Sequence, residues 1–384
     1  MTEKLFYADS HLFSFRAVVA ACEAAGERWR VTLDRTAFFP EGGGQPGDTG
    51  RLGEARVLDV REENGEIWHL TDRPLPVGAA AEGEVDAEQR LRRMQNHSGE
   101  HVVSGLVHRF YGYDNVGFHM GESCMTIDFS GELSEEQLRR VEDAANAVVR
   151  DNRPVRAWFP GAEELAALDY RSKKELTDAV RLVEIKGVDL CACCAPHVAF
   201  TGEIGAIKLL SAERHRGGMR VELICGLDAL EDYRRRLESA AAVSRALSVP
   251  REEIASGVER LLDERDAWKA RCAALSMELV RRRAEGTERS EGNLIVFEPL
   301  LDEIALRELV NLLTEKCGGF AAAFSGSDGE GYRYVIGSRR VDLRAAARRI
   351  NAAVNGRGGG SPEMIQGRAA ADAETIRAAL FELV

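Results

Sequence analysis

The sequence His97-Ser-Gly-Glu-His101 places two histidines four positions apart in a segment with helical apolar spacing. On a helix, side chains at i and i+4 share a face, so both imidazoles can ligate one metal ion. Such a pair is a weak signal alone. Further along the chain, Leu190-Cys-Ala-Cys-Cys-Ala-Pro-His197 offers a thiolate and an imidazole four positions apart, at Cys193 and His197. Together the four side chains form a nitrogen and sulfur set that suits tetrahedral zinc, and we expect one zinc per chain.

Other interpretations of these residues remain open from the sequence. Cys191 and Cys194 form a CxxC that could be a redox pair, although no thioredoxin-like βαβ pattern surrounds it. His197 could instead be a buried core histidine, with the thiols acting as small apolar residues. Glu100 directly precedes the second histidine, so the HExxH register of zincins is wrong, and we expect a solvated or second-shell carboxylate.

Composition narrows the class of protein. The chain has 384 residues, of which 45% are hydrophobic and 30% charged, which allows two or three globular domains. Neither a long apolar run nor a signal-peptide layout occurs, so we expect a cytoplasmic protein without membrane contact. The net charge of −12 argues against a general nucleic-acid coat protein but allows a local basic groove.

The hydrophobic pattern predicts an α+β multidomain fold. Residues 1–87 have short alternating segments and the hairpin signal Asn64-Gly65, which favour a small β-barrel. Residues 88–227 mix helical and strand signals and are expected to form an α+β zinc-containing domain. The last block, 287–384, alternates strands with helices at 303–317, 343–355 and 373–383 and predicts an α/β domain. Between helix and strand, Gly356–Ser361 is expected to be a flexible loop.

Residues 228–286 are highly charged and helix-forming. Pro250, Glu252 and Glu253 are typical of a helix N-terminus. Beyond them a 3.5-residue apolar period indicates a helical hairpin or coiled coil, or an amphipathic helix lying on its own domain. The seam consists of Ile254, Val258, Leu261, Arg265, Trp268, Cys272, Leu275 and Leu279. This linker or the last domain is a candidate homodimer contact.

A further motif is Asp34-Arg-Thr-Ala-Phe-Phe-Pro-Glu-Gly-Gly-Gly-Gln-Pro46. Its consecutive glycines, Gly42, Gly43 and Gly44, allow positive φ and let the backbone approach a ligand, although a plain glycine-rich turn would look the same. In order and spacing, this motif, HxxxH, Cys193-x-x-x-His197 and Thr201-Gly-Glu-Ile-Gly205 resemble the editing part of alanyl-tRNA synthetase and the freestanding AlaX proteins. Gly358-Gly-Gly-Ser-Pro-Glu-Met-Ile-Gln366 resembles the DHH-associated domain that closes these proteins.

The resemblance implies a zinc-dependent hydrolase that deacylates mischarged alanine tRNA carrying serine or glycine. It places Thr36 beside the amino-acid side chain and Gln45 beside the ester. The family pattern Cys-Gly-Gly-Thr-His is altered here by Cys194, Ala195 and Pro196, which leaves Cys191 and Cys194 as competing ligands. Nothing resembles an adenylate-forming domain or the Asp-His-His motif of DHH phosphoesterases, so the chain looks like an editing factor and not a ligase.

Local positive charge predicts where tRNA phosphates would bind, and the resemblance implies alanine tRNA, through its acceptor end, as the partner. Residues 333–349 contain one acid, Asp342, and six arginines: Arg333, Arg339, Arg340, Arg344, Arg348 and Arg349. We expect Arg344 and Arg348 in particular to contact phosphates, although a solvated helix face would look alike. The competing functional hypotheses are a non-catalytic, zinc-stabilised tRNA-binding module and a zinc hydrolase acting on a small ester or amide.

Overall fold

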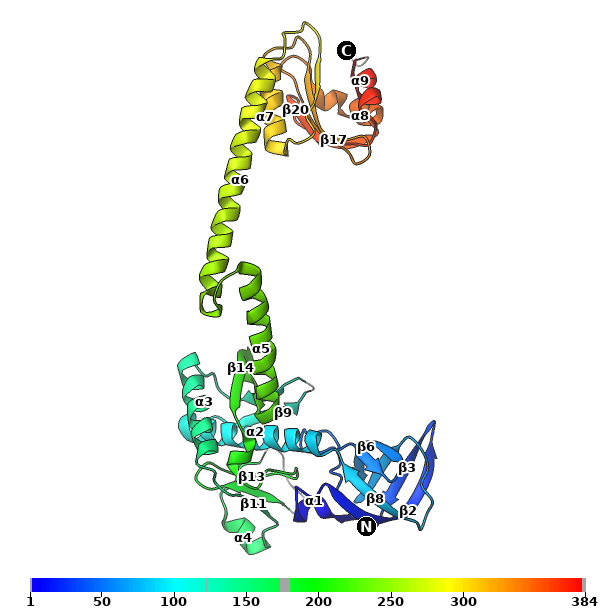
Figure 1. Cartoon of the computed structure of the whole chain (residues 1–384), viewed down its shortest axis with the longest axis vertical. Coiled ribbons are helices and arrows are strands. Elements are labelled where there is room, and N and C mark those ends of the chain that lie inside the picture. Colours follow the sequence, from blue (N-terminus) through cyan, green and yellow to red (C-terminus); the bar gives the residue numbers. More distant parts are fainter. Residues whose placement is uncertain (1, 122, 173–179, 382–384) are drawn as a thin grey trace. The chain divides into compact units, whose positions relative to one another are not determined.

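The computed structural model describes residues 2–121, 123–172 and 180–381. The chain divides into two compact units, Met1–Ser239 and Ala240–Val384, and each contains helices and strands (Figure 1). The predicted mixed α/β multidomain architecture is therefore confirmed. No helix among the described residues is both long and apolar enough to cross a membrane.

The N-terminal strands form a closed barrel with the neighbour order β2-β3-β7-β6-β5-β8. Apolar side chains alternate into it along β2, where Phe15, Ala17 and Val19 are buried. Asn64 and Gly65 connect β6 to β7 with positive φ values of 53° and 78°, as the hairpin signal predicted. The barrel strands are β2 (Ser14–Ala25), β3 (Arg28–Leu33), β5 (Gly50–Leu52), β6 (Ala55–Glu63), β7 (Glu66–Thr71) and β8 (Ala80–Val85). The elements β1 (Glu3–Lys4) and α1 (Leu5–Ala8) precede the barrel in sequence. Strand β1 pairs in parallel with β4 (Arg35–Thr36).

Helix α2 (Ala87–Tyr111) follows the barrel and carries both histidines of the HxxxH pair. Its N-cap, Asp86, accepts a hydrogen bond from the Gln89 backbone. A Cβ on Gly99 would lie 2.3 Å from Cys225 Sγ, and one on Gly105 would lie 2.5 Å from the Val188 carbonyl. These helical glycines cost local stability but let α2 lie close to its neighbours, which positions the histidines.

Two sheets pack around α2 in the first unit. One has the order β14-β15-β10-β9 and the other β11-β12-β13. Their bounds are β9 (Asn115–Met120), β10 (Met125–Phe129), β11 (Val155–Trp158), β12 (Leu182–Ile185), β13 (Asp189–Ala192), β14 (Ile207–His215) and β15 (Gly218–Cys225). The remaining helical elements here are α3 (Glu135–Arg150), α4 (Ala162–Ala167) and the 3₁₀ turn η1 (Thr201–Ile204). The shared core includes Met94, Val102, Ile127, Val141 and Val221.

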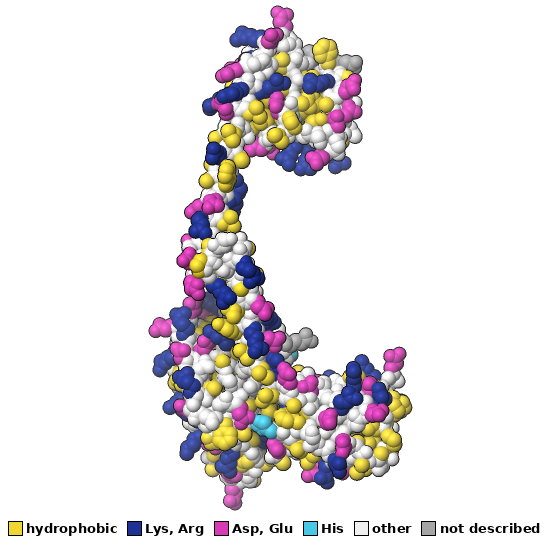
Figure 2. Space-filling model, viewed as in Figure 1, with side chains coloured by type: hydrophobic (Ala, Val, Ile, Leu, Met, Phe, Trp, Pro, Cys, Tyr) yellow, Lys and Arg dark blue, Asp and Glu magenta, His cyan; other side chains and the backbone are white. Residues whose placement is uncertain are grey.

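Helix α5 (Gly226–Leu247) and the turn η2 (Arg251–Glu253) lead into α6 (Ile254–Glu285). The C-terminal end of α6 packs through Val280 and Ala284 into the core that includes α7 (Glu303–Thr314). Most of the predicted apolar seam is exposed instead, with Trp268 at 62% and Leu275 at 63%, and Figure 2 shows apolar side chains between charged ones on α6. A partner for this seam stays a prediction.

The second unit contains a five-stranded sheet of order β16-β17-β18-β20-β19. Its elements are β16 (Leu294–Phe297), β17 (Ala321–Ser327), β18 (Gly331–Gly337), α8 (Leu343–Ala353), β19 (Gly356–Gly360), β20 (Met364–Ala369) and α9 (Ala373–Phe381). The last two residues of the predicted 373–383 helix lie outside the described residues. The predicted loop at Gly356–Ser361 is wrong, because Gly356–Gly360 pairs as an antiparallel edge strand with β20. Glycine is needed there, since a Cβ on Gly358 would lie 2.2 Å from Tyr334 Oη.

Candidate metal centre

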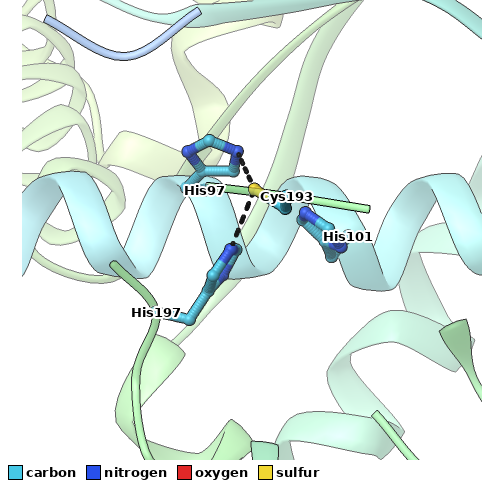
Figure 3. Close-up of side chains that lie close together, drawn as sticks. All are labelled: His97, His101, Cys193 and His197. Atoms are coloured by element: carbon cyan, nitrogen blue, oxygen red, sulfur yellow. Dashed lines mark hydrogen bonds between the residues drawn. The ribbon is translucent and has the colours of Figure 1, made fainter. Parts of the chain in front are cut away.

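The two sequence motifs converge on one buried cluster. His97 and His101 come from successive turns of α2, while Cys193 and His197 come from the segment after β13 (Figure 3). Cys193 Sγ lies 3.3 Å from His197 Nε2 and 3.5 Å from His97 Nε2. One donor atom from each of the four residues falls within 4.8 Å of all the others. These side chains could therefore hold one metal ion.

Each histidine has its other ring nitrogen engaged. Nδ1 of His97 lies 3.0 Å from Gln45 Oε1, and Nδ1 of His101 lies 2.8 Å from Asp189 Oδ2. Nδ1 of His197 lies 3.0 Å from the Ser98 hydroxyl. An Nδ1–H that donates to such a partner fixes the ring and leaves Nε2 as the ligand atom, the arrangement typical of metal-binding histidines.

The pKa shifts of Cys193 and His197 favour metal binding. Burial alone would raise the pKa of Cys193, but His97 and His197 nearby, with hydrogen bonds from His101 and His197, hold it well below its usual range. Burial lowers the pKa of His197 to about 3, which keeps this imidazole neutral. A thiolate and neutral imidazoles are the forms in which cysteine and histidine bind metal.

The other two cysteines of the motif occupy different surroundings. Cys191 is buried and groups with His101 and Asp189, and burial raises its pKa. Cys194 Sγ lies where a Cβ on Gly43 would come within 3.3 Å, and burial raises its pKa to about 11. Both thiols therefore favour the protonated form. The geometry supports Cys193 as the thiolate ligand.

The glycine motif lies against this cluster. Gly42 and Gln45 exchange two backbone hydrogen bonds of 3.0 Å across a tight turn, with φ of 61° at Gly43 and 82° at Gly44. A Cβ on Gly44 would lie 2.7 Å from the ring of Phe118, which in turn packs against His97 at 4.9 Å between centroids. The turn therefore delivers the buried Gln45 side chain to His97.

A buried ion pair joins the glycine motif to α2. Arg90 and Asp48 are both almost fully buried and form a salt bridge, with Arg90 Nε 2.9 Å from Asp48 Oδ2. Arg90 Nη2 also donates to the Ala37 carbonyl at 2.6 Å, and the Phe39 N–H donates to Asp48 at 2.7 Å. This network holds the motif in register with the helix that carries His97.

Thr36 has a different set of partners. It is fully buried, and its hydroxyl lies 2.9 Å from His69 Nε2 while accepting the Phe38 N–H at 3.1 Å. His69 Nδ1 lies 3.0 Å from the Val31 carbonyl. The predicted place of Thr36 beside an amino-acid substrate stays a prediction.

Glu100 is not solvated, so that part of the sequence interpretation is wrong. It is fully buried, and Oε1 accepts hydrogen bonds from Ser104 Oγ at 2.7 Å and Asn115 Nδ2 at 2.5 Å. Its Oε2 lies 3.8 Å from His101 Nε2. With Asp189 it raises the pKa of His101 well above its usual value, against the opposing effect of burial. Glu100 is thus part of the shell around the cluster.

The second unit distributes the predicted arginine stripe over β18, the bend at Arg339 and Arg340, and α8. Arg344, Arg348 and Arg349 are exposed on α8, while Arg339 pairs with Glu315 at 2.9 Å. Arg333 on β18 is opposite Arg368 on β20, which is opposite Arg357 on β19. These last three residues form an exposed row across the sheet that we call the arginine row.

Sequence reasoning missed several of these residues. Asp189, Ser98 and His69 reach their partners across long sequence separations, so no local spacing signals them. Arg357 and Arg368 join Arg333 only through strand register. A period-2 reading of 364–369 as a strand could have found Arg368.

Two parts of this chain match known protein families, one in each unit. Residues 180–222, which include Cys193 and His197, match the family described as "Threonyl and Alanyl tRNA synthetase second additional domain". Residues 291–384, which include the arginine row, match the DHHA1 domain family. A C-Ala domain structure from Aquifex aeolicus alanyl-tRNA synthetase is 22% identical over 24% of this chain and 88% of its own, with a TM-score of 0.21, too low to inform the fold.

Relatives match over nearly the whole chain. Alanine–tRNA ligase of Natronomonas pharaonis is 34% identical over 90% of this chain and 39% of its own length. The same enzyme of Halorubrum lacusprofundi is 34% identical over 95% of this chain and 42% of its own length. That of Methanopyrus kandleri is 32% identical over 95% of this chain and 42% of its own length. The chain thus spans about two fifths of the length of these relatives. With a tRNA_SAD match and a DHHA1 match in one chain, this protein is similar to the alanyl-tRNA synthetases over nearly its whole length.

Proposed function

We propose that this protein is a zinc-dependent trans-editing hydrolase that deacylates mischarged alanine tRNA, Ser-tRNA(Ala) above all and Gly-tRNA(Ala) as well. The observation that best supports this proposal is the buried cluster of His97, His101, Cys193 and His197, whose donor atoms lie within 4.8 Å of one another. Three imidazoles and a thiolate are ligands that zinc prefers. When bound, zinc would lower the pKa of an added water or anchor the substrate's amino group or ribose hydroxyl.

Gln45 would act on the ester carbonyl. Its Oε1 lies 3.0 Å from His97 Nδ1, so the amide is oriented, and its buried Nε2 has no hydrogen-bond partner among the described residues. Leaving a buried donor unsatisfied costs about 1–3 kcal/mol. A substrate carbonyl that accepts from Nε2 would remove this cost and would be held beside the cluster. Water then adds to the carbonyl carbon, the ester C–O bond breaks, and the ribose hydroxyl leaves with a proton.

Thr36 would select the amino acid through its hydroxyl. If Nδ1–H of His69 donates to the Val31 carbonyl, His69 Nε2 must accept, so the Thr36 hydroxyl donates to His69. The Thr36 oxygen is then left as an acceptor for the serine hydroxyl, which alanine lacks.

Thr36→Val keeps the volume and removes this acceptor. Losing one partner in a buried site costs about 1–3 kcal/mol, so we expect the ratio of Ser-tRNA to Ala-tRNA hydrolysis to fall about 5- to 100-fold. Metal content should stay unchanged. An unaltered ratio would place discrimination elsewhere.

The acceptor end of alanine tRNA is the proposed partner, with phosphates contacted by the second unit. The arginine row and the α8 arginines Arg344 and Arg348 support this, because Arg333, Arg357 and Arg368 lie side by side in the sheet and are exposed. Neutralising phosphate charge is the main sequence-independent source of RNA affinity.

The direct test compares hydrolysis of Ser-tRNA(Ala), Gly-tRNA(Ala) and Ala-tRNA(Ala) by the purified protein. We expect release of serine and glycine well above background, with Ala-tRNA spared, and loss of turnover in His97→Ala. Equal rates for all three, or rates insensitive to His97→Ala, would refute the proposal.

One observation favours a second candidate, a non-catalytic zinc-stabilised tRNA-binding module. The four residues could fill a tetrahedral shell, and the three histidines are at most 4% exposed, as in a closed structural site. Metal removal separates the two. A structural ion's loss should unfold the first unit, whereas a catalytic ion's loss should mainly abolish turnover.

A further inference from the structure

The cluster is less buried at Cys193 than at its histidines. His97, His101 and His197 are buried, whereas Cys193 and its neighbour Cys194 are partly exposed. The part of the cluster nearest to solvent among the described residues is therefore the backbone around Cys193. The side chains that surround this backbone decide what kind of molecule can approach.

Strand register brings an aromatic and a cationic residue to this place. In the β11-β12-β13 sheet, Trp158 is opposite Leu182, and Leu182 is opposite Ala192. One residue beyond this row, the Cys193 N–H donates to the Arg181 carbonyl at 3.0 Å. Phe159 directly follows β11 and Cys193 directly follows β13, so the two residues leave the sheet at the same end.

Arg181 and Tyr7 complete this surface. Arg181 Nη1 donates to the carbonyls of Cys193 at 3.1 Å and Ala195 at 2.8 Å, which holds the ligand loop. The Arg181 guanidinium carbon lies 5.0 Å from the Tyr7 ring centroid, and Tyr7 packs edge-on against Phe159 at 5.4 Å. Arg181 is itself buried, at 7% exposed, and no carboxylate among the described residues forms a salt bridge with it.

Phe159 is half exposed, at 50%, although it belongs to this packed group. Exposed aromatic rings beside a cationic side chain form the stacking surfaces that bind single-stranded nucleic acid, since every base has a π-face. Hydrolysis of an aminoacyl ester on the terminal ribose also requires the attached base to lie next to the cluster. The chemistry and the position of this surface therefore fit the same ligand.

We propose that Phe159, supported by Tyr7 and Arg181, is the platform on which the unpaired 3′-terminal base of the tRNA stacks while its ester reaches the cluster. The proposal rests on the proposed deacylase function and deepens it by assigning the surface that receives the substrate's end. Phe159 is a binding residue in this scheme. Arg181 positions the Cys193 loop and supplies positive charge.

The first test measures deacylation of Ser-tRNA(Ala) by Phe159→Ala and Phe159→Trp. Loss of one base–aromatic stack should lower kcat/KM about 5- to 100-fold, mostly through KM, and Phe159→Trp should restore it. The matched control is Phe200→Ala, because Phe200 is 46% exposed in the same unit. A decrease of equal size in Phe200→Ala, or none in Phe159→Ala, would overturn the proposal.

The second test does not depend on turnover. A non-hydrolysable 3′-seryl-amide tRNA carries 2-aminopurine in place of its terminal adenine, and stacking on an aromatic ring quenches its fluorescence. We expect quenching by the wild type and Phe159→Trp, and little by Phe159→Ala. Equal quenching by wild type and Phe159→Ala would refute the platform. Quenching without any wild-type deacylation would instead refute the proposed function and leave the binding surface supported.

Discussion

The candidate metal cluster of the first unit and the arginine row of the second unit are built in opposite ways. In the cluster, His97, His101 and His197 are buried and each has a partner on Nδ1. In the row, Arg333 and Arg368 are exposed, and no described carboxylate lies within salt-bridge distance of either. In the cluster, hydrogen bonds fix the orientation of the polar side chains. In the arginine row, the positive charges stay free to bind a ligand.

This difference predicts different responses to substitution. A buried hydrogen-bonded network fails as a unit, because removing one member leaves the others unsatisfied in a low-dielectric site. Exposed charges contribute singly and are screened by salt. Mutations in the cluster should therefore produce large, discrete losses, and those in the row small, additive ones.

The largest effect is expected from Cys193→Ala. Removing the thiolate should reduce bound zinc far below one per chain and cost several kcal/mol in turnover, about a thousand-fold or more. Cys191→Ala and Cys194→Ala should retain zinc, because their thiols favour the protonated form. Elemental analysis of the three variants decides it. Zinc lost in Cys191→Ala but retained in Cys193→Ala would show that the ligand assignment is wrong.

Asp189→Asn should have the next largest effect. The carboxylate lies 2.8 Å from His101 Nδ1 and also accepts from Arg171 Nε at 2.8 Å. Losing such an outer-shell carboxylate typically weakens metal binding about 10- to 100-fold. Zinc affinity from chelator competition measures this. Asp114→Asn is the matched control, since Asp114 pairs with His108 at 3.0 Å on the surface, and equal weakening in both variants would contradict the role of Asp189.

The sequence predicted the cluster because its information is local. The four-residue steps from His97 to His101 and from Cys193 to His197 indicate which side chains of each motif lie together, whereas the meeting of the two motifs depends on the fold. Helix α2 and the Asn64-Gly65 hairpin were predictable for the same reason. The outer residue Asp189 was not, since it precedes the cysteine motif without any spacing relation to His101.

Tertiary contacts decide the features that the sequence did not reveal. The Gly356–Gly360 segment has the composition of a loop, yet it pairs with β20 as a strand, and Gly358 lies so close to Tyr334 and the β20 backbone that a Cβ would clash. The 3.5-residue period predicted the α6 helix but not its surroundings, and Trp268 and Leu275 prove exposed. Arg368 is recognised as part of a basic surface only from the strand pairing, which places it between Arg333 and Arg357.

The stability of the fold in acid should depend on His69, a buried residue of the first unit. Burial lowers the pKa of His69 to about 4 from its usual 6.5, despite the hydrogen bond to Val31. Between these two values the unfolded chain binds the proton and the folded chain does not, so stability is complete above about pH 6.5 and is lost as pH falls toward 4.

This group alone should lower the free energy of unfolding by about 2 kcal/mol between pH 7 and pH 5. Urea unfolding of zinc-loaded wild type and His69→Gln at the two pH values measures the difference. The variant should lose less stability than the wild type, whereas His119→Gln, which removes an exposed histidine, should follow the wild type. Parallel losses in wild type and His69→Gln would contradict the effect.

The smallest effect is expected from Arg368→Ala in the arginine row. If each exposed guanidinium neutralises about one phosphate, removing it should weaken tRNA binding a few-fold and reduce the slope of log affinity against log salt by about one. Arg339→Ala is the matched control, because Glu315 already pairs with Arg339 at 2.9 Å, and its slope should barely change. The double variant Arg344→Ala/Arg348→Ala tests whether tRNA contacts α8 or the arginine row of the sheet. If only this pair changes the slope, the tRNA contact lies on α8, and the row is a solvated surface despite its alignment.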